Sequence, residues 1–219
     1  VIIHRTFKLS IINSLIALHQ RFIFNCDFIN NFYVKSTISK EFLNDISNNG
    51  IVLALGHYGL YYNFVALNYI SKCSIACIYK MKTPWLEKFI YESSKYKNHI
   101  LPMRHDKLAK LMMNNHDIIS ITCDQKANTN KKPIIFLNQN SNFHYSVVDI
   151  HKITKRSLWL YFPFYDFKKK KINIELMPIC RQYDSKISKH KLLQEIADKL
   201  SKKILQNPDQ YFWIHDRFN

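Results

Sequence analysis

The stretch that decides the fold is residues 50–59, which read Gly-Ile-Val-Leu-Ala-Leu-Gly-His-Tyr-Gly. Its centre, residues 51–55, is an unbroken run of apolar side chains, which is typical of a parallel strand buried on both faces. Glycines interrupt the run at positions 56 and 59, and residues 60–70 continue with the apolar spacing of a helix. The stretch therefore predicts a strand, a tight turn that contains His57, and a helix.

The same alternation continues along the chain. We expect further strands at residues 73–79, 100–101, 118–123, 134–137, 158–164 and 172–177. We expect helices at residues 4–24, 38–48, 84–97, 106–114, 146–154 and 190–206. Strands that alternate with helices indicate an α/β fold, and no repeat or linker divides the chain. The sequence thus predicts one α/β domain over residues 38–219, with a mostly parallel central sheet flanked by helices.

Residues 1–37 form a separate N-terminal segment in this interpretation. Its helix has a broad apolar face, and the polar side carries Arg5, Lys8 and Arg21. A basic amphipathic helix can lie in a membrane interface, or it can simply pack on the domain, and both interpretations stay open. No stretch reaches the ~18 apolar residues of a membrane span. The sequence opens on Val1, so an anchoring segment that precedes it also stays open.

Composition narrows the classes of partner and cofactor. Lys and Arg number 32 against 16 Asp and Glu, a net charge of +16, which favours anionic partners such as an acidic membrane surface. Nucleic acid is a weaker alternative, because no nucleic-acid-binding signature occurs and the basic residues are dispersed. The five cysteines contain no CxxC pair, so we expect neither a disulfide framework nor a metal site, and no cofactor.

Two ionisable residues follow predicted strands, and in open α/β sheets function concentrates at the carboxyl ends of strands. His57 follows the strand at residues 51–55, and Asp124 follows the strand at residues 118–123. A neutral imidazole at His57 could act as a general base on a hydroxyl that attacks an acyl carbonyl. The helix that begins beside it would offer backbone N–H groups to the oxyanion. The alternative is a capping or core histidine.

The stretch at residues 50–59 resembles the start of the catalytic motif in the lipid A biosynthesis acyltransferases. These form the lauroyl- and myristoyl-transferring branch of the lysophospholipid acyltransferase superfamily. Asp124-Gln125 resembles the family's Asp-Gln pair at a strand end, and residues 135–138 occupy the place of its Val-Phe-Phe-Gly. The closing stretch, residues 207–218, is very similar to the family's last motif. The resemblance covers residues 40–219 and implies a glycerolipid-acyltransferase-like fold.

The resemblance also implies a reaction and a place for it. A fatty acyl group would move from an acyl carrier protein or acyl-CoA to a hydroxyl of a lipid A precursor or related glycolipid, in lipopolysaccharide biosynthesis. The enzyme would work at the cytoplasmic face of the bacterial inner membrane, either peripherally or anchored by an N-terminal segment. His57 would be the base, and the reaction would need no cofactor.

One departure from the family concerns its acid. The family's His-x4-Asp/Glu pattern places that acid at Tyr62, and a neutral tyrosine cannot supply the charge that orients the imidazole. Three interpretations follow: Asp124 serves instead, the enzyme is slow, or the protein is an inactive relative that binds lipid or membrane.

We expect four residues to bind substrate: Gly59, Tyr62, Lys80 and Arg104. Arg104 and Lys80 follow predicted strands and could hold phosphate groups, although Lys80 lacks the bidentate geometry of arginine. The alternative for both is a solvated surface charge.

Overall fold

The fold was analysed in a computed structural model. It describes residues 2–23, 31, 38–61, 67, 71–78, 85, 100–103, 116–127, 132–213 and 218, with the backbone alone at residues 16–23, 78 and 100–103. The helices are α1 (Ile2–Ile23), α3 (Lys40–Asn49), α7 (Ser146–Thr154), α8 (Lys189–Gln206) and the 3-10 helix η3 (Pro208–Gln210). The strands are β1 (Ile51–Leu55), β2 (Ile75–Ile78), β3 (Ile100–Met103), β4 (Ile118–Thr122), β5 (Ile134–Phe136), β6 (Gln139–Ser141), β7 (Ser157–Asp166) and β8 (Lys171–Cys180).

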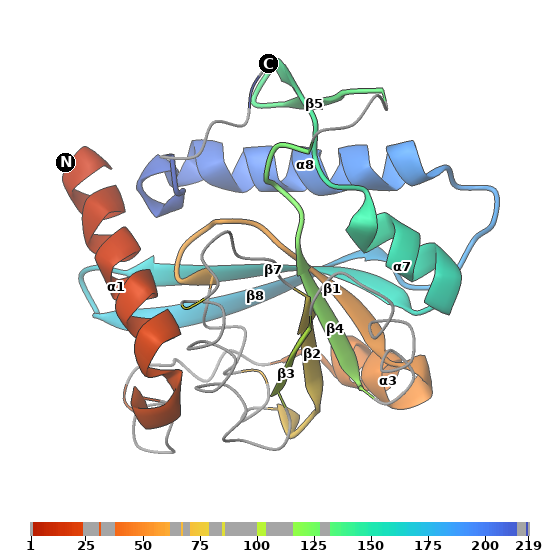
Figure 1. Ribbon diagram of the computed structural model, residues 1–219, viewed down its shortest axis with the longest axis horizontal. Coiled ribbons are helices and arrows are strands. Elements are labelled where there is room, and N and C mark those ends of the chain that lie inside the picture. The colour runs from red at the N-terminus through yellow and green to blue at the C-terminus, as the bar shows by residue number, and fades with distance from the viewer. Residues whose placement is uncertain are drawn as a thin grey trace.

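Six strands form the central sheet in the order β3-β2-β4-β1-β7-β8 (Figure 1). Neighbours from β3 to β7 pair in parallel, and β8 returns antiparallel to β7. The predicted α/β fold with a mostly parallel sheet flanked by helices is therefore confirmed. β1 lies in the middle, and all five of its residues are buried, as expected for a strand covered on both faces.

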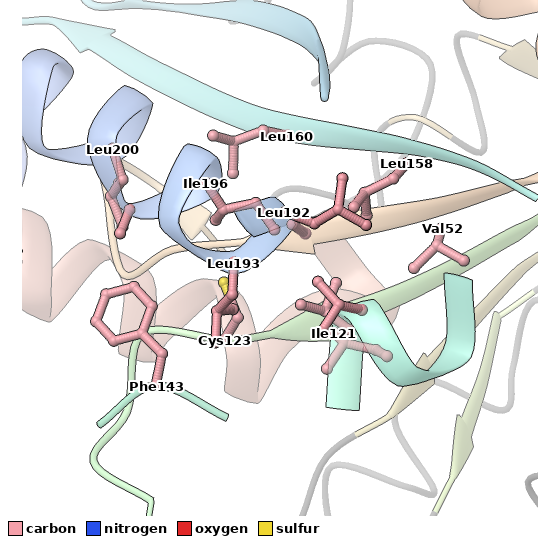
Figure 2. Close-up of a cluster of buried hydrophobic side chains, with 14 of the residues drawn as sticks. Val52, Ile121, Cys123, Phe143, Leu158, Leu160, Leu192, Leu193, Ile196 and Leu200 are labelled. Atoms are coloured by element: carbon pink, nitrogen blue, oxygen red, sulfur yellow. The ribbon is translucent and has the colours of Figure 1, made fainter. Parts of the chain in front are cut away.

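Side-chain alternation along β1 divides the core into two layers. Val52 and Ala54 face a cluster that includes the buried sides of α7 and α8. Figure 2 shows leucines and Ile196 of α8 lying against side chains of β1, β4 and β7 in this layer. Ile51, Leu53 and Leu55 face the opposite cluster, which includes residues of α1 and α3. The helices thus cover both faces of the sheet (Figure 1).

Local sequence explains where the packed helices begin and end. The Ser39 hydroxyl accepts a hydrogen bond from the Phe42 N–H at the start of α3, and Gly50 ends that helix at φ +71°. Ser188 caps α8 in the same way through the Lys191 N–H. Asn207-Pro208 ends α8, because proline cannot continue the helical hydrogen bonds.

The predicted helices at residues 4–24, 38–48, 146–154 and 190–206 and the predicted strands agree with the structure to within a few residues, apart from two extensions. Both strands of the β7–β8 hairpin extend further than predicted. The strand β6 and the turn η3 were not predicted, since residues 139–141 are polar and residues 208–210 are too short to show a periodicity. The helices expected at 84–97 and 106–114, and most of the one at 60–70, lie outside the described residues.

Candidate active site

His57 and Asp124 lie at the same edge of the sheet because of the β1–β4 register. Leu55 pairs with Thr122 in parallel, and each candidate residue stands two positions beyond its member of that pair. The ladder continues past the strands, since the Cys123 N–H donates to the Leu55 carbonyl over 3.0 Å. The two turns that follow the strands therefore leave the sheet side by side, at the carboxyl ends where α/β proteins place their sites.

Asp124 holds His57 at two points. Its Oδ1 lies 2.5 Å from the imidazole Nδ1, and its Oδ2 accepts the His57 backbone N–H over 2.9 Å. An ionised carboxylate only accepts hydrogen bonds, so in the neutral imidazole Nδ1 is the nitrogen that carries the proton and Nε2 presents a lone pair. Asp124 is fully buried, and His57 is 5% exposed. The pair is therefore an imidazole with a fixed ring and a fixed tautomer.

The C-terminal segment completes the surroundings of Asp124. The Tyr211 hydroxyl donates to Asp124 Oδ2 over 2.9 Å, and Tyr211 is itself 1% exposed. These three hydrogen bonds help to compensate the buried carboxylate for its lost water. The same segment pairs with the turn as a short antiparallel bridge, in which Phe212 N–H donates to the His57 carbonyl and Gly59 N–H to the Gln210 carbonyl.

Gly59 closes the turn in a conformation that requires glycine. Its φ is +58°, and a Cβ at this position would come within 1.5 Å of the Pro163 carbonyl oxygen. The Gly59 carbonyl accepts from Asn13 Nδ2 of α1 over 2.8 Å. The N–H and the carbonyl of Gly59 are thus both bonded within the chain. That Gly59 contacts substrate stays a prediction.

The expected oxyanion donors at this turn are already in use. The N–H groups of His57, Gly59 and Leu60 donate to Asp124 Oδ2, the Gln210 carbonyl and the Pro163 carbonyl. Residues 62–66, where the sequence predicts the continuation into a helix, lie outside the described residues. The described part of the turn therefore serves to fix His57 and leaves no N–H of these three for an oxyanion.

The Nε2 side of the imidazole faces Gln125 and aromatic rings. Gln125 Nε2 lies 3.3 Å from His57 Nε2, and the glutamine side chain is exposed. The Tyr61 ring packs edge-on against the imidazole at 4.7 Å between centroids, and Phe212 stacks on it at 6.2 Å. The imidazole thus has an exposed amide near Nε2 and two aromatic rings packed against it.

Cys123, next to Asp124, is the nearest thiol in sequence to the pair. It is fully buried, and burial together with the charge of Asp124 raises the pKa of the thiol well above its ordinary value. The thiolate is the nucleophilic form of cysteine, so this side chain is unsuited to form an acyl-enzyme. Of the predicted catalytic residues, His57 therefore stays the candidate for the base.

The structure brings together His57, Asp124 and Gly59 of the predicted site residues. Tyr62, Lys80 and Arg104 lie outside the described residues. Sequence reasoning missed Tyr211 and Asn13. Tyr211 lies within the quoted closing motif at residues 207–218, which was a usable signal; nothing in the sequence distinguishes Asn13.

Two cavities lie away from His57. One of about 490 Å³ lies near Asp45 and Arg181, by the residues that lead into β1 and β7. The other, of about 430 Å³, lies between the β5–β6 hairpin and α8.

The sequence matches one family model over most of its length. The model for bacterial lipid A biosynthesis acyltransferases matches residues 17–219. The chain belongs to this family. The resemblance drawn from the sequence is thereby confirmed, and the protein is an acyltransferase of the lipid A type. A comparison with curated proteins finds no match.

Membership of the lipid A biosynthesis acyltransferase family implies an acyl donor and a lipid acceptor. Among the helices that the structure describes, none combines the length and the apolar character needed to cross a bilayer.

Proposed function

We propose that this acyltransferase transfers a fatty acyl group from an acyl carrier protein or CoA thioester to a hydroxyl of a lipid A precursor or related glycolipid. His57 is the general base, and Asp124 is the residue that positions it. The observation that carries the proposal is the 2.5 Å contact between His57 Nδ1 and Asp124 Oδ1. It leaves Nε2 as the atom that can accept a proton.

The reaction needs only one proton relay. Nε2 of His57 takes the proton of the acceptor hydroxyl as the oxygen forms a bond to the thioester carbonyl carbon. When the C–S bond breaks, the imidazolium returns that proton to the departing thiolate. The buried Asp124 charge stabilises the imidazolium between these two events.

Gln125 occupies the position from which a hydroxyl would approach. Its amide reaches His57 Nε2 at 3.3 Å, which is the long end of a hydrogen bond. The side chain is exposed, so it can turn away when an acceptor hydroxyl arrives. In the proposal, the Gln125 amide therefore donates a hydrogen bond to Nε2 between turnovers, and the acceptor hydroxyl replaces it when substrate binds.

The acceptor is a lipid, so the proposal places the reaction at a membrane surface, on the cytoplasmic face of the bacterial inner membrane. The net charge of +16 supports contact with an anionic leaflet, and it also supports contact with an acidic acyl carrier protein.

The test is thioester turnover by a His57 variant. Release of free carrier thiol is followed with the glycolipid acceptor present and absent. His57→Ala is expected to lower kcat by a factor on the order of 10² to 10⁴, the usual contribution of a positioned general base. His190→Ala, at the far end of α8, is the matched control and keeps the wild-type rate.

Two outcomes would overturn the proposal. A rate that is unchanged in His57→Ala would remove the base. Vesicle binding without any turnover by the wild-type protein would instead indicate an inactive lipid-binding relative.

A further inference from the structure

One face of α1 carries a row of exposed apolar side chains. Ile3, Phe7, Ile11 and Leu15 recur every fourth residue, so they follow one side of the helix. Ile3 is 85% exposed and Phe7 is 61% exposed. Isolated exposed apolar residues are ordinary, but a contiguous row marks an interaction surface. These four residues are the α1 stripe.

The opposite side of α1 is packed on the domain. Leu9 is buried in the core layer beneath β1, and Thr6 and Asn13 are also buried. The Arg5 guanidinium pairs with the Asp209 carboxylate over 2.9 Å, and the Thr6 hydroxyl reaches the Asp209 carbonyl. The α1 stripe therefore faces outward because the other face is already used.

Positive charge borders the α1 stripe. The 22 residues of α1 contain no Asp or Glu, and Lys8 is exposed beside the apolar row. A helix with apolar and basic residues on its outer face has the composition of an interfacial helix on anionic lipid.

A second basic element lies next to α1. The turn between β7 and β8 carries Lys168–Lys170, three exposed lysines, which we call the hairpin tip. The Arg5 guanidinium lies 5.1 Å above the ring of Phe167, so α1 and the hairpin are in contact. Figure 1 shows the end of the β7–β8 hairpin beside α1. The Asp166 carboxylate accepts the N–H groups of Lys168 and Lys169, so this acid is used to hold the turn.

We propose that the α1 stripe and the hairpin tip together form a docking surface for an anionic lipid bilayer. The apolar row would enter the boundary between headgroups and acyl chains, and the lysines would lie among the phosphates. The inference deepens the proposed function, from which it takes the lipid acceptor, but the binding it describes needs no catalysis.

Hydrogen bonds link the docking surface to the candidate active site. Asn13 of α1 donates to the Gly59 carbonyl, and Arg5 holds Asp209, which immediately precedes Gln210 of the bridge to the turn. A bilayer bound at this surface therefore takes a fixed position relative to His57, as an enzyme that collects its acceptor from a membrane requires.

The test is flotation of the whole chain with vesicles. One set contains phosphatidylglycerol and phosphatidylethanolamine, and the other contains phosphatidylcholine alone. Wild type is expected to bind the anionic vesicles at least about tenfold more tightly. Phe7→Ser, and separately the triple change Lys168→Glu, Lys169→Glu and Lys170→Glu, are each expected to weaken that binding about tenfold.

Matched control variants remove an exposed apolar side chain or reverse three lysine charges at other surface positions. Ile153→Ser deletes an apolar side chain that is 63% exposed on α7, and the triple change Lys186→Glu, Lys191→Glu and Lys202→Glu reverses three other exposed lysines. Both controls are expected to bind as wild type does. Circular dichroism melts establish that every variant is folded.

Three results would overturn the docking surface: wild type that does not bind anionic vesicles, test variants that bind like wild type, or controls that lose as much binding. A Phe7→Ser change that dissolves a dimer and leaves vesicle binding intact would make the α1 stripe an interface between two copies, and would also overturn it. His57→Ala must still bind vesicles. If the wild-type protein releases thiol but does not bind the anionic vesicles, the docking surface is refuted and the proposed function is not.

Discussion

Asp124 binds His57 twice, through the imidazole Nδ1 at 2.5 Å and through the backbone N–H at 2.9 Å. The first contact sets the tautomer of the ring, and the second fixes the backbone from which the ring extends. A residue 67 positions away in sequence thus supplies the orientation that the family's pattern assigns to position 62. Four testable consequences follow from this arrangement and from the contacts around it, and one more concerns an ion pair elsewhere in the fold.

The first concerns Tyr62, where the family has its acid. Asp124 already accepts the Nδ1 proton, so a second carboxylate has no unfilled role on that side of the ring. Tyr62→Glu is expected to leave kcat for acyl transfer within a few-fold of wild type. A large gain in thiol release would show that Asp124 does not replace the missing acid.

The second concerns the Tyr211 hydroxyl, which donates to the buried Asp124 carboxylate. Tyr211→Phe deletes one of three donors and keeps the aromatic packing. It is expected to lower the free energy of unfolding by about 1 to 3 kcal/mol, the cost of leaving a buried charged group short of a partner. Urea denaturation measures the change.

The control for Tyr211→Phe is Tyr183→Phe, because Tyr183 is 37% exposed. Its unfolding free energy should match that of wild type. Equal stability of the two variants would mean that the Tyr211 hydroxyl adds nothing to the site.

The third concerns Asn13 as a positioning residue. Asn13→Ala removes the donor to the Gly59 carbonyl and leaves that carbonyl unsatisfied within the protein. We expect kcat to fall more than KM rises, because the turn that holds His57 loosens while substrate contacts stay. Ser14→Ala, on the exposed side of the same helix, is the control. A rise in KM alone would assign Asn13 to substrate binding instead.

The fourth concerns Asp45, which lies far from the site. Its burial raises the pKa of the carboxyl, but hydrogen bonds from Arg181, Trp159 and Ser157 outweigh burial, so the pKa stands below its ordinary value of 3.8. The Arg181 guanidinium and the Trp159 indole make these contacts at 3.0–3.1 Å. A lowered pKa in the folded state stabilises the protein above the unfolded-state pKa, and that stability is lost as the pH falls through the folded-state pKa.

Asp45→Asn therefore should lower the free energy of unfolding at pH 7, and the difference from wild type should shrink as the pH falls below about 4. Denaturation at a series of pH values measures both. A difference that does not change with pH would show that the carboxylate charge of Asp45 does not contribute.

The local features of the fold could be predicted from the sequence because they depend on local patterns. The apolar run at residues 51–55 is enough to predict a buried strand, and the placement of His57 and Asp124 just after two strands is enough to predict that they share an edge of the sheet. That β1 and β4 are direct neighbours was not predictable, since strand order depends on how the whole chain packs. Their adjacency decides that the two side chains touch.

Contacts between distant segments could not be predicted for the same reason. Asn13 and Tyr211 reach the site from α1 and from the C-terminal segment, and each contact depends on the final packing of an element with no local signal of its role. The antiparallel direction of β8 was also not specified by the sequence. The roles of Tyr62, Lys80 and Arg104 remain predictions.

The central claim is that Asp124 orients the His57 imidazole and supplies the negative charge that stabilises the imidazolium. An Asp124→Asn variant tests this claim most directly. An asparagine can turn its amide N–H₂ toward Nδ1, which favours the opposite tautomer and places the proton on Nε2. The measurement is kcat for thiol release with the glycolipid acceptor, with Asp198→Asn on the outer side of α8 as control. The account predicts a loss on the order of 10³ to 10⁴ in Asp124→Asn and none in the control. A folded Asp124→Asn enzyme with kcat within a few-fold of wild type would contradict it.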